Sequence, residues 1–156
     1  VLTAGEARNA IDLDVIITVA ASFGLGAAME NSGLAAVLAD GIVTTFEGFG
    51  PLGVLFGIIL ATSLVTELIT NNAAAALIFP IAWATAIRID ADPRLFGIVV
   101  ATMASTSFLT PIGYQTNTMV YGPGGYRFTD YTRLGAPVTV VVMVVILLVA
   151  KFWYGM

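Results

Sequence analysis

Apolar segments of helical length, separated by short polar stretches, run through most of the chain. Residues 1–12 are polar and predict a loop, and the apolar residues that follow predict a transmembrane helix over 13–33. The shorter apolar stretch over 34–47 ends in charged residues, which favours a helix lying along the membrane interface. The continuous apolar run over 134–153 ends in a lysine and aromatic residues, and it predicts a last transmembrane helix with an interfacial anchor.

The polar stretch Thr66–Asn72 divides the apolar run over 51–88 into two arms. Each arm is shorter than the roughly 20 residues that cross a bilayer. A single helix through both arms would exceed the membrane thickness and bury Glu67 near the bilayer centre, at about 2.5–3.5 kcal/mol or more. The alternative is a re-entrant hairpin with the polar stretch at its tip. We favour the hairpin, because irregular backbone is tolerated at depth where protein buries it or where it lines an aqueous cavity.

A second interruption falls inside the helical segment over 94–126. Pro111 lacks a backbone donor and disfavours helix at Thr110, and Gly113 loosens the backbone two residues later. The helix should therefore break over Thr110–Asn117, at about the same depth as the hairpin tip. The predicted fold class is an all-α polytopic membrane protein with a re-entrant helical hairpin and an interrupted transmembrane helix.

Composition supports a membrane location. The chain is 58% hydrophobic and only 10% charged, and its mean hydropathy is +0.96, whereas soluble domains carry about a quarter charged residues. We expect an integral protein of a plasma membrane of bacterial type, in contact with the lipid bilayer. No basic run indicates a nucleic-acid partner. Without His or Cys, and with one carboxylate in the interrupted segments, the sequence offers no base–nucleophile pair, so we expect no enzyme.

Two interrupted segments in one chain indicate a transport site built from broken helices. Seven polar residues would gather there: Thr66, Thr70, Asn71, Asn72, Gln115, Thr116 and Asn117. Neutral oxygen ligands of this kind suit a weakly held Na+. No Lys or Arg lies between Arg8 and Arg88, or between Arg94 and Arg127. A small anionic substrate would therefore be held by amides, helix N-termini and the bound cation, which is a physical route to coupling.

Other polar residues in the apolar segments have a simpler interpretation. Hydroxyl side chains in membrane helices usually bond to their own backbone, which is the role we expect for Thr62, Ser63, Thr85, Ser105 and Ser107. Glu67 stays open between facing a water-filled cavity, being protonated, capping the tip, or pairing with a group outside this chain. Two rival functions also remain, an ion channel or pore domain and a non-transporting structural subunit. A channel would need a continuous polar face, but the polar residues cluster at two breaks.

The two interrupted segments also carry a family resemblance. The stretches Thr66-Glu-Leu-Ile-Thr-Asn-Asn-Ala-Ala-Ala-Ala-Leu-Ile-Phe-Pro80 and Thr110-Pro-Ile-Gly-Tyr-Gln-Thr-Asn-Thr-Met-Val-Tyr-Gly122, with Arg133-Leu-Gly135, resemble the divalent anion:sodium symporter family. That family includes citrate-transporter-like, dicarboxylate and sulfate members. The resemblance implies two inverted repeats, each with a re-entrant hairpin and an interrupted helix, and an elevator-type motion against a dimeric scaffold. Residues 1–156 would be the second repeat, the C-terminal half of a transporter that lacks its N-terminal half here and is a homodimer when full length.

The resemblance also implies a division of the site residues. Thr70-Asn71-Asn72 matches the Ser-Asn-Thr tip motif, which assigns Asn71 to both sodium and substrate and Asn72 to substrate. The sodium site would add backbone oxygens of Thr66, Ile69 and Gly113 and the Thr70 oxygen. Gln115 and Thr116 would complete the substrate site. Asn72 in place of Thr, and Gln115-Thr116 in place of the prolines of dicarboxylate members, lean slightly toward sulfate over a dicarboxylate.

Overall fold

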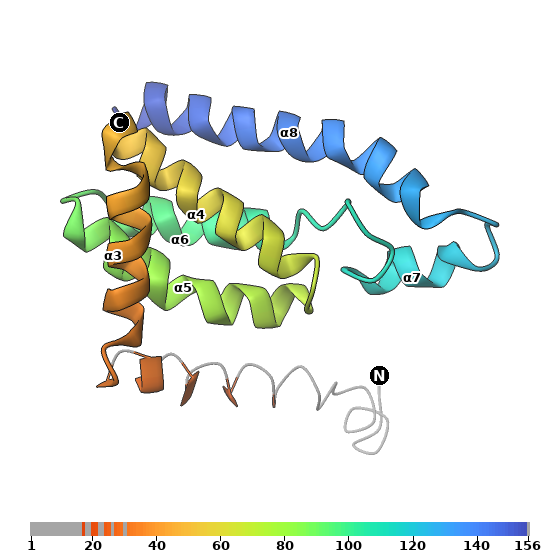
Figure 1. Cartoon of the computed structure of the whole chain (residues 1–156), viewed down its shortest axis with the longest axis horizontal. Coiled ribbons are helices and arrows are strands. Elements are labelled where there is room, and N and C mark those ends of the chain that lie inside the picture. Colours follow the sequence, from red (N-terminus) through yellow and green to blue (C-terminus); the bar gives the residue numbers. More distant parts are fainter. Residues whose placement is uncertain (1–16, 18–19, 22–23, 26, 30, 156) are drawn as a thin grey trace, which may run out of the picture.

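The structure, a computed structural model, describes residues 17, 20–21, 24–25, 27–29 and 31–155. The loop predicted over 1–12, and much of the helix predicted over 13–33, lie outside these residues. Every element after them is helical (Figure 1). The elements are α3 (Leu34–Phe46), the short 3-10 turn η1 (Glu47–Phe49), α4 (Gly50–Thr66), α5 (Asn71–Arg88), α6 (Pro93–Ala104), α7 (Gln115–Tyr121) and α8 (Phe128–Trp153).

The chain turns sharply between α3 and α4. Together they form a run of 33 residues that is long and apolar enough to cross a membrane. The run is not straight, because η1 interrupts it and Gly50 takes a positive φ of 71°, which glycine adopts at little cost because it has no Cβ. As a result α3 runs across the long axis of the other helices (Figure 1). An ion pair between Asp40 and Arg88 connects α3 to α5. Both side chains are half exposed, so the pair contributes only about 0–1 kcal/mol to stability.

Helices α4 and α5 form an antiparallel hairpin that packs against α6 (Figure 1). The chain leaves the helical conformation over 67–70, so one continuous helix through the polar stretch does not occur. Thr70 caps the start of α5, where its side chain accepts a hydrogen bond from the Ala73 backbone N–H at 3.4 Å. The turn that the sequence predicted at Thr66–Asn72 is therefore present.

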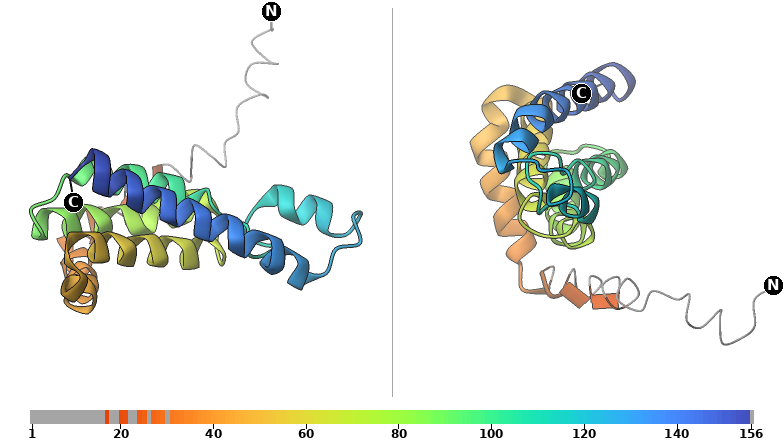
Figure 2. Two further views of the ribbon diagram at one scale, coloured as in Figure 1. Left: turned by 90° about the horizontal axis from the view of Figure 1, so that it is seen from above. Right: turned by 90° about the vertical axis from the view of Figure 1, so that its right-hand side faces the viewer.

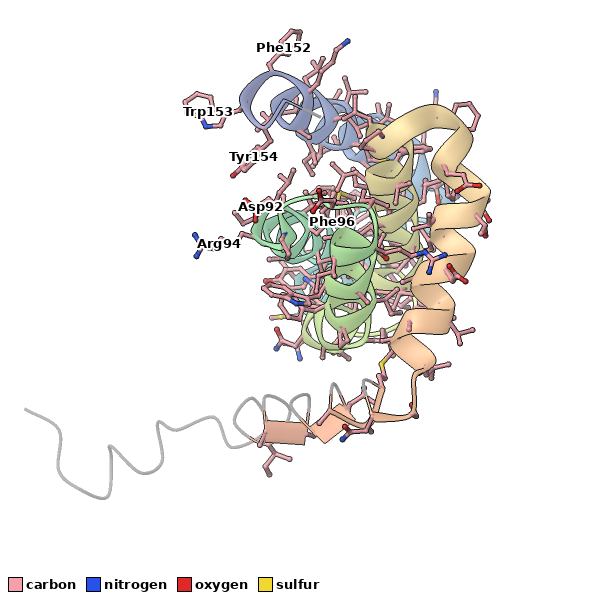
Figure 3. The ribbon with its side chains drawn as sticks, turned by 90° about the vertical axis from the view of Figure 1, so that its left-hand side faces the viewer. Asp92, Arg94, Phe96, Phe152, Trp153 and Tyr154 are labelled. Carbon is pink, nitrogen blue, oxygen red and sulfur yellow. The ribbon has the colours of Figure 1, made fainter. Side chains whose placement is uncertain are left out.

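The three helices enclose a core of aliphatic and aromatic side chains. Its largest fully buried members are Leu55, Ile58, Ile59, Phe96 and Met103. Figure 3 shows Phe96 between the helices, whereas Phe152 projects outward from α8. The same view shows Asp92 and Arg94, at the start of α6, close to the end of α8 that carries Trp153 and Tyr154. The charged loop between α5 and α6 and the aromatic anchor thus lie at one end of the molecule.

Truncating Phe96 should destabilise the protein through this core. Phe96 is fully buried, so Phe96→Ala leaves a cavity that we expect to cost about 3–5 kcal/mol of unfolding free energy. The matched control is Phe152→Ala, because 79% of the Phe152 surface is exposed, and we expect a change within about 0.5 kcal/mol. Thermal unfolding of the full-length protein in detergent measures both, and equal melting temperatures would contradict this packing.

The second interruption begins earlier than the sequence predicted. The backbone is non-helical over 105–114, whereas Gln115 and the two residues after it are already in α7. The side chains of Ser105 and Thr106 bond to the backbone carbonyls of Ala101 and Thr102, at 3.2 and 2.8 Å. Such local bonds compete with the helical pattern, which explains why α6 ends at this polar run before Pro111 is reached.

The last helix also begins earlier than predicted, at Phe128 instead of residue 134. The Arg127 backbone N–H donates to the Asp130 carboxylate at 2.8 Å, so this polar segment caps the helix and extends it. With 26 residues, α8 is about 39 Å long, and with 17 residues α4 is about 26 Å long. The tip of the hairpin accordingly stops part-way along α8 (Figures 1 and 2).

Candidate ion and substrate site

The two non-helical segments meet and bond to each other. The Ser107 hydroxyl donates to the Thr66 carbonyl at 3.2 Å, and the Thr110 hydroxyl donates to the Glu67 carbonyl at 3.3 Å. In the other direction, the Leu109 backbone N–H donates to Glu67 Oε1 at 3.0 Å. Carbonyls at the end of a helix have no partner within it, so these bonds satisfy the end of α4 from the second break.

Gly113 is the point of closest approach between the two segments. A Cβ added there would overlap Ser107 Oγ and would lie 3.1 Å from the Thr66 carbonyl oxygen and 3.2 Å from Glu67 Oε2. The glycine is therefore required by space, because no side chain fits against these three oxygens. Gly113 is buried, and its N–H is held by the Thr110 hydroxyl at 3.1 Å.

Thr66 and Asn71 lie together on the inner side of the tip. The Thr66 hydroxyl is fully buried, donates to the Ala104 carbonyl at 2.5 Å, and contacts Asn71 Oδ1 at 3.0 Å. Because a hydroxyl carries one hydrogen, the Ala104 and Asn71 oxygens compete for it. The half-buried Asn71 side chain is thus fixed beside the end of α4 while keeping acceptor capacity.

The other tip residues are open to the surface. Ile69, Thr70 and Asn72 are exposed, and the Thr70 hydroxyl oxygen serves as the cap of α5. The first backbone N–H groups of α5 follow immediately, and the N-terminal end of an 18-residue helix favours negative charge. The tip therefore presents carbonyl and amide oxygens next to a positive helix end.

Residues of the second break divide into two groups. Gln115 and Thr116 are exposed at the start of α7, and within the described residues no hydrogen bond links them to Asn71 or Asn72. The Asn117 amide donates to the carbonyls of Ser107 and Thr110, at 3.0 and 3.2 Å. Of the predicted residues, the structure thus brings Thr66, Asn71 and Gly113 together and uses Asn117 to hold the broken backbone.

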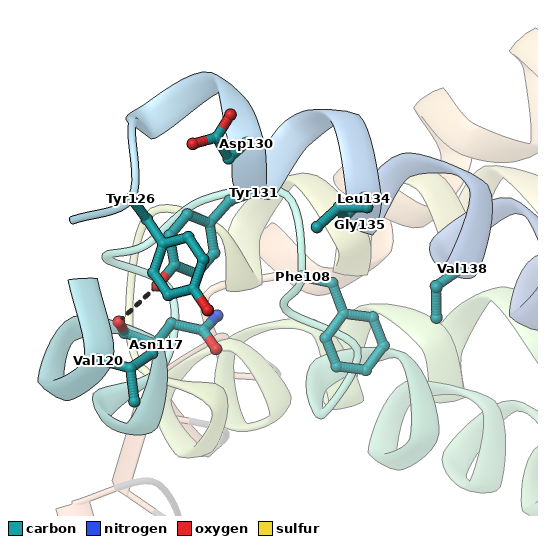
Figure 4. Close-up of a pocket in the computed structure, with 9 residues that line it drawn as sticks. All are labelled: Phe108, Asn117, Val120, Tyr126, Asp130, Tyr131, Leu134, Gly135 and Val138. Carbon is teal, nitrogen blue, oxygen red and sulfur yellow. Dashed lines mark hydrogen bonds between the residues drawn. The ribbon is translucent and has the colours of Figure 1, made fainter. Parts of the chain in front are cut away.

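A separate cavity of about 360 Å³ lies between α7 and α8 (Figure 4). Tyr131 crosses it, and its hydroxyl donates to the Asn117 carbonyl at 3.0 Å. The lining is mostly apolar, with Phe108, Leu134 and Val138 among its members, and its charged residue is the acid Asp130. Such a cavity does not suit an anion, so we place the candidate site at the tip and not here.

Comparison with known proteins identifies the family. The sequence profile described as "Citrate transporter" matches residues 1–156, which is the whole chain. The chain belongs to the citrate transporter family. This confirms the resemblance to divalent anion:sodium symporters, and together with the apolar helices it indicates an integral membrane location.

Three relatives of this chain are named as transporters or cotransporters. An uncharacterized transporter of Synechocystis sp. is 46% identical over 99% of this chain and 25% of its own length. Sodium/sulfate cotransporter 1 of Chlamydomonas reinhardtii is 40% identical over 92% of this chain and 16% of its own length. A sodium-dependent dicarboxylate transporter of Staphylococcus saprophyticus is 28% identical over 94% of this chain and 28% of its own length. The chain thus spans between 16% and 28% of the length of these relatives.

Two residues at the meeting point, Ser107 and Glu67, have partners there that the sequence did not identify. Thr62, Thr85 and Ser105 bond back to their own helices, as the sequence predicted. Ser107 does not, because α6 has already ended and its hydroxyl turns to the Thr66 carbonyl instead. Glu67 is 5% exposed and faces the second break. The one sequence signal for both was their position next to a helix end, which does not reveal the partner.

Proposed function

We propose that this chain forms the second, C-terminal repeat of a sodium-coupled symporter that carries a small divalent anion, a dicarboxylate or sulfate, by an elevator-type motion. The observation that carries this proposal is the contact between the two broken segments, where Thr66 and Glu67 of the tip bond to Ser107, Leu109 and Thr110. Broken helices that meet within an apolar bundle are the recurring design of secondary transporter sites.

The cation would bind on the inner side of the tip. We assign its ligands to the backbone oxygens of Thr66, Ile69 and Gly113 and to side-chain oxygens of Thr70 and Asn71. In support of this assignment, the Thr66 carbonyl lies beside Gly113, and the Asn71 side-chain oxygen lies beside the Thr66 hydroxyl. Carbonyl, hydroxyl and amide oxygens with little charge suit Na+, which must bind and leave within each transport cycle.

The anion would bind at the outer side of the same tip. Asn71 and Asn72 are the first residues of α5, so their amides and the N-terminal backbone groups can act on one oxyanion. Gln115 and Thr116, exposed at the start of α7, would complete the contact. No Lys or Arg occurs between Arg94 and Arg127, so the bound cation supplies the positive charge that the anion needs. Binding of each ion then favours the other.

The lengths of the helices support a re-entrant placement. α8 exceeds the roughly 30 Å of a bilayer core, whereas the hairpin of α4 and α5 is shorter and stops part-way along it (Figure 1). The hairpin would enter from the end that carries Arg88 and Arg94, with α3 along the membrane surface. We place the full-length protein in a plasma membrane of bacterial type, as a homodimer that includes the first repeat.

Uptake by the full-length protein tests this function. We expect labelled sulfate or succinate to accumulate in proteoliposomes under an inward Na+ gradient, and the accumulation to be lost when K+ or choline replaces Na+. Sulfate and succinate compete for the same site, so an excess of the preferred anion should suppress uptake of the other. Anion flux down the anion's own gradient that does not depend on Na+ would favour a channel. The absence of any anion flux would favour a structural subunit.

A further inference from the structure

Glu67 has a buried carboxylate oxygen without a hydrogen-bond partner within the described residues. The side chain is 5% exposed, and Oε1 accepts the Leu109 backbone N–H at 3.0 Å. Oε2 is equally covered, yet it has no hydrogen-bond partner within the described residues. A buried carboxylate oxygen without a partner costs free energy, and an unpaired buried carboxylate costs several kcal/mol. The site therefore needs a positive partner for Glu67.

The surroundings of Glu67 supply no such partner. Its neighbours from the second break are Ser107, Leu109, Thr110 and Gly113, none of which is charged. In the part of the chain that the structure describes, the one ion pair joins Asp40 to Arg88, and none reaches Glu67. Because Oε2 is covered by this chain's own atoms, a side chain from elsewhere in the protein would have to displace that cover. A small ion needs less room.

Three oxygens converge beside Gly113. The position that a Cβ would occupy lies 3.2 Å from Glu67 Oε2, 3.1 Å from the Thr66 carbonyl oxygen and against Ser107 Oγ. One of these oxygens is anionic, one is a carbonyl at the end of a helix, and one is a hydroxyl that can rotate. This combination of hard oxygen ligands and a single negative charge matches a monovalent cation.

We propose that Glu67 is the anionic ligand of a monovalent cation, Na+, held beside Gly113 with the Thr66 carbonyl and the Ser107 hydroxyl. A bound Na+ would use all three oxygens. The inference rests on the proposed function, because it adds a carboxylate to the sodium site at the tip. It also changes the charge balance there: the empty site is negative and repels the anionic substrate, and the bound cation removes this repulsion.

Glu67→Gln in the full-length protein tests this ligand, since it keeps the size and the acceptor for Leu109 but removes the charge. We expect the half-saturating Na+ concentration for anion uptake to rise at least about tenfold. A wild-type Na+ response would overturn the proposal.

The matched control is Glu47→Gln, because Glu47 is exposed on η1 and lies at the opposite end of α4 from the tip. It should leave the Na+ response unchanged. Binding is also measured without transport, as the rise in melting temperature of the detergent-solubilised protein with Na+. The wild type should show a rise that Glu67→Gln lacks, and equal rises would overturn the proposal even if no anion is transported.

If Glu67→Gln does not fold, Glu67→Asp replaces it. Aspartate keeps the charge but withdraws it from Gly113 by one methylene, so the Na+ response should shift, and an unshifted response would count against a cation at Oε2. A wild-type protein without Na+-driven uptake would instead disprove the proposed function. The two failures are therefore distinguishable.

Discussion

Asn71→Ala is expected to abolish Na+-dependent anion uptake by the full-length protein. Asn71 is the first residue of α5, and its Oδ1 lies 3.0 Å from the Thr66 hydroxyl, beside the carbonyl assigned to the cation. Its amide is also adjacent to the N-terminal backbone groups that would hold the anion. Alanine removes one contact to each ion, and because the two ions depend on each other, the losses reinforce each other. Initial rates of labelled sulfate and succinate uptake measure this effect.

Ser63→Ala is the control for that substitution. Ser63 is also small and polar, lies one turn before Thr66 on α4, and is 3% exposed. We expect its replacement to leave Na+-dependent uptake near the wild-type rate, because a buried hydroxyl away from the tip contributes only to packing. Equal activity in Asn71→Ala and Ser63→Ala would argue against a site at the tip.

Gly113→Ala should remove uptake for a different reason, because the added methyl group separates the two broken segments. Its Cβ would overlap Ser107 Oγ and press against the Thr66 carbonyl at 3.1 Å and Glu67 Oε2 at 3.2 Å. Forcing a methyl group into such a contact typically costs about 1–3 kcal/mol of stability. We therefore expect loss of uptake together with a lower melting temperature.

Two further variants make the Gly113 prediction specific. Gly122→Ala adds the same methyl group where no atom lies within 4 Å, so uptake and melting temperature should remain those of the wild type. Adding Ser107→Ala to Gly113→Ala removes the most severe overlap and should recover part of the lost stability, as a double-mutant cycle would show. Full activity in Gly113→Ala would mean that the two segments do not meet as described.

The hairpin helices and the approximate place of both interruptions could be predicted because a long apolar helix leaves a strong sequence signal. The arms of the hairpin were recognised by their length against the bilayer, and the turn at 67–70 lies inside the polar stretch that the sequence marked. Pro111 and Gly113 indicated the second break for local steric reasons. These signals are local, so they needed no knowledge of the tertiary structure.

The details that depend on distant contacts could not be predicted. The first turn of α8 is polar and resembles a loop, and its cap involves the Arg127 backbone and Asp130 in a geometry that composition does not encode. In the site, Glu67 and Leu109 are 42 positions apart, and Thr66 and Ser107 are 41 apart. Hydropathy identified the two segments as interrupted, but it contains no information about which atom of one faces which atom of the other.

The links between the two broken segments end mostly on main-chain atoms: the carbonyls of Thr66 and Glu67 and the N–H of Leu109. A main-chain partner persists whatever side chain its residue carries. A substitution at Leu109 would therefore change the side-chain packing but keep the hydrogen bond from its backbone N–H. The side chains of Ser107, Thr110 and Glu67 form the other end of these hydrogen bonds, so substituting one of them removes its bond. Related proteins should accordingly differ at exposed site residues such as Asn72 and Gln115, which would change the substrate. The main-chain contacts that join the two broken segments should be the same in all of them.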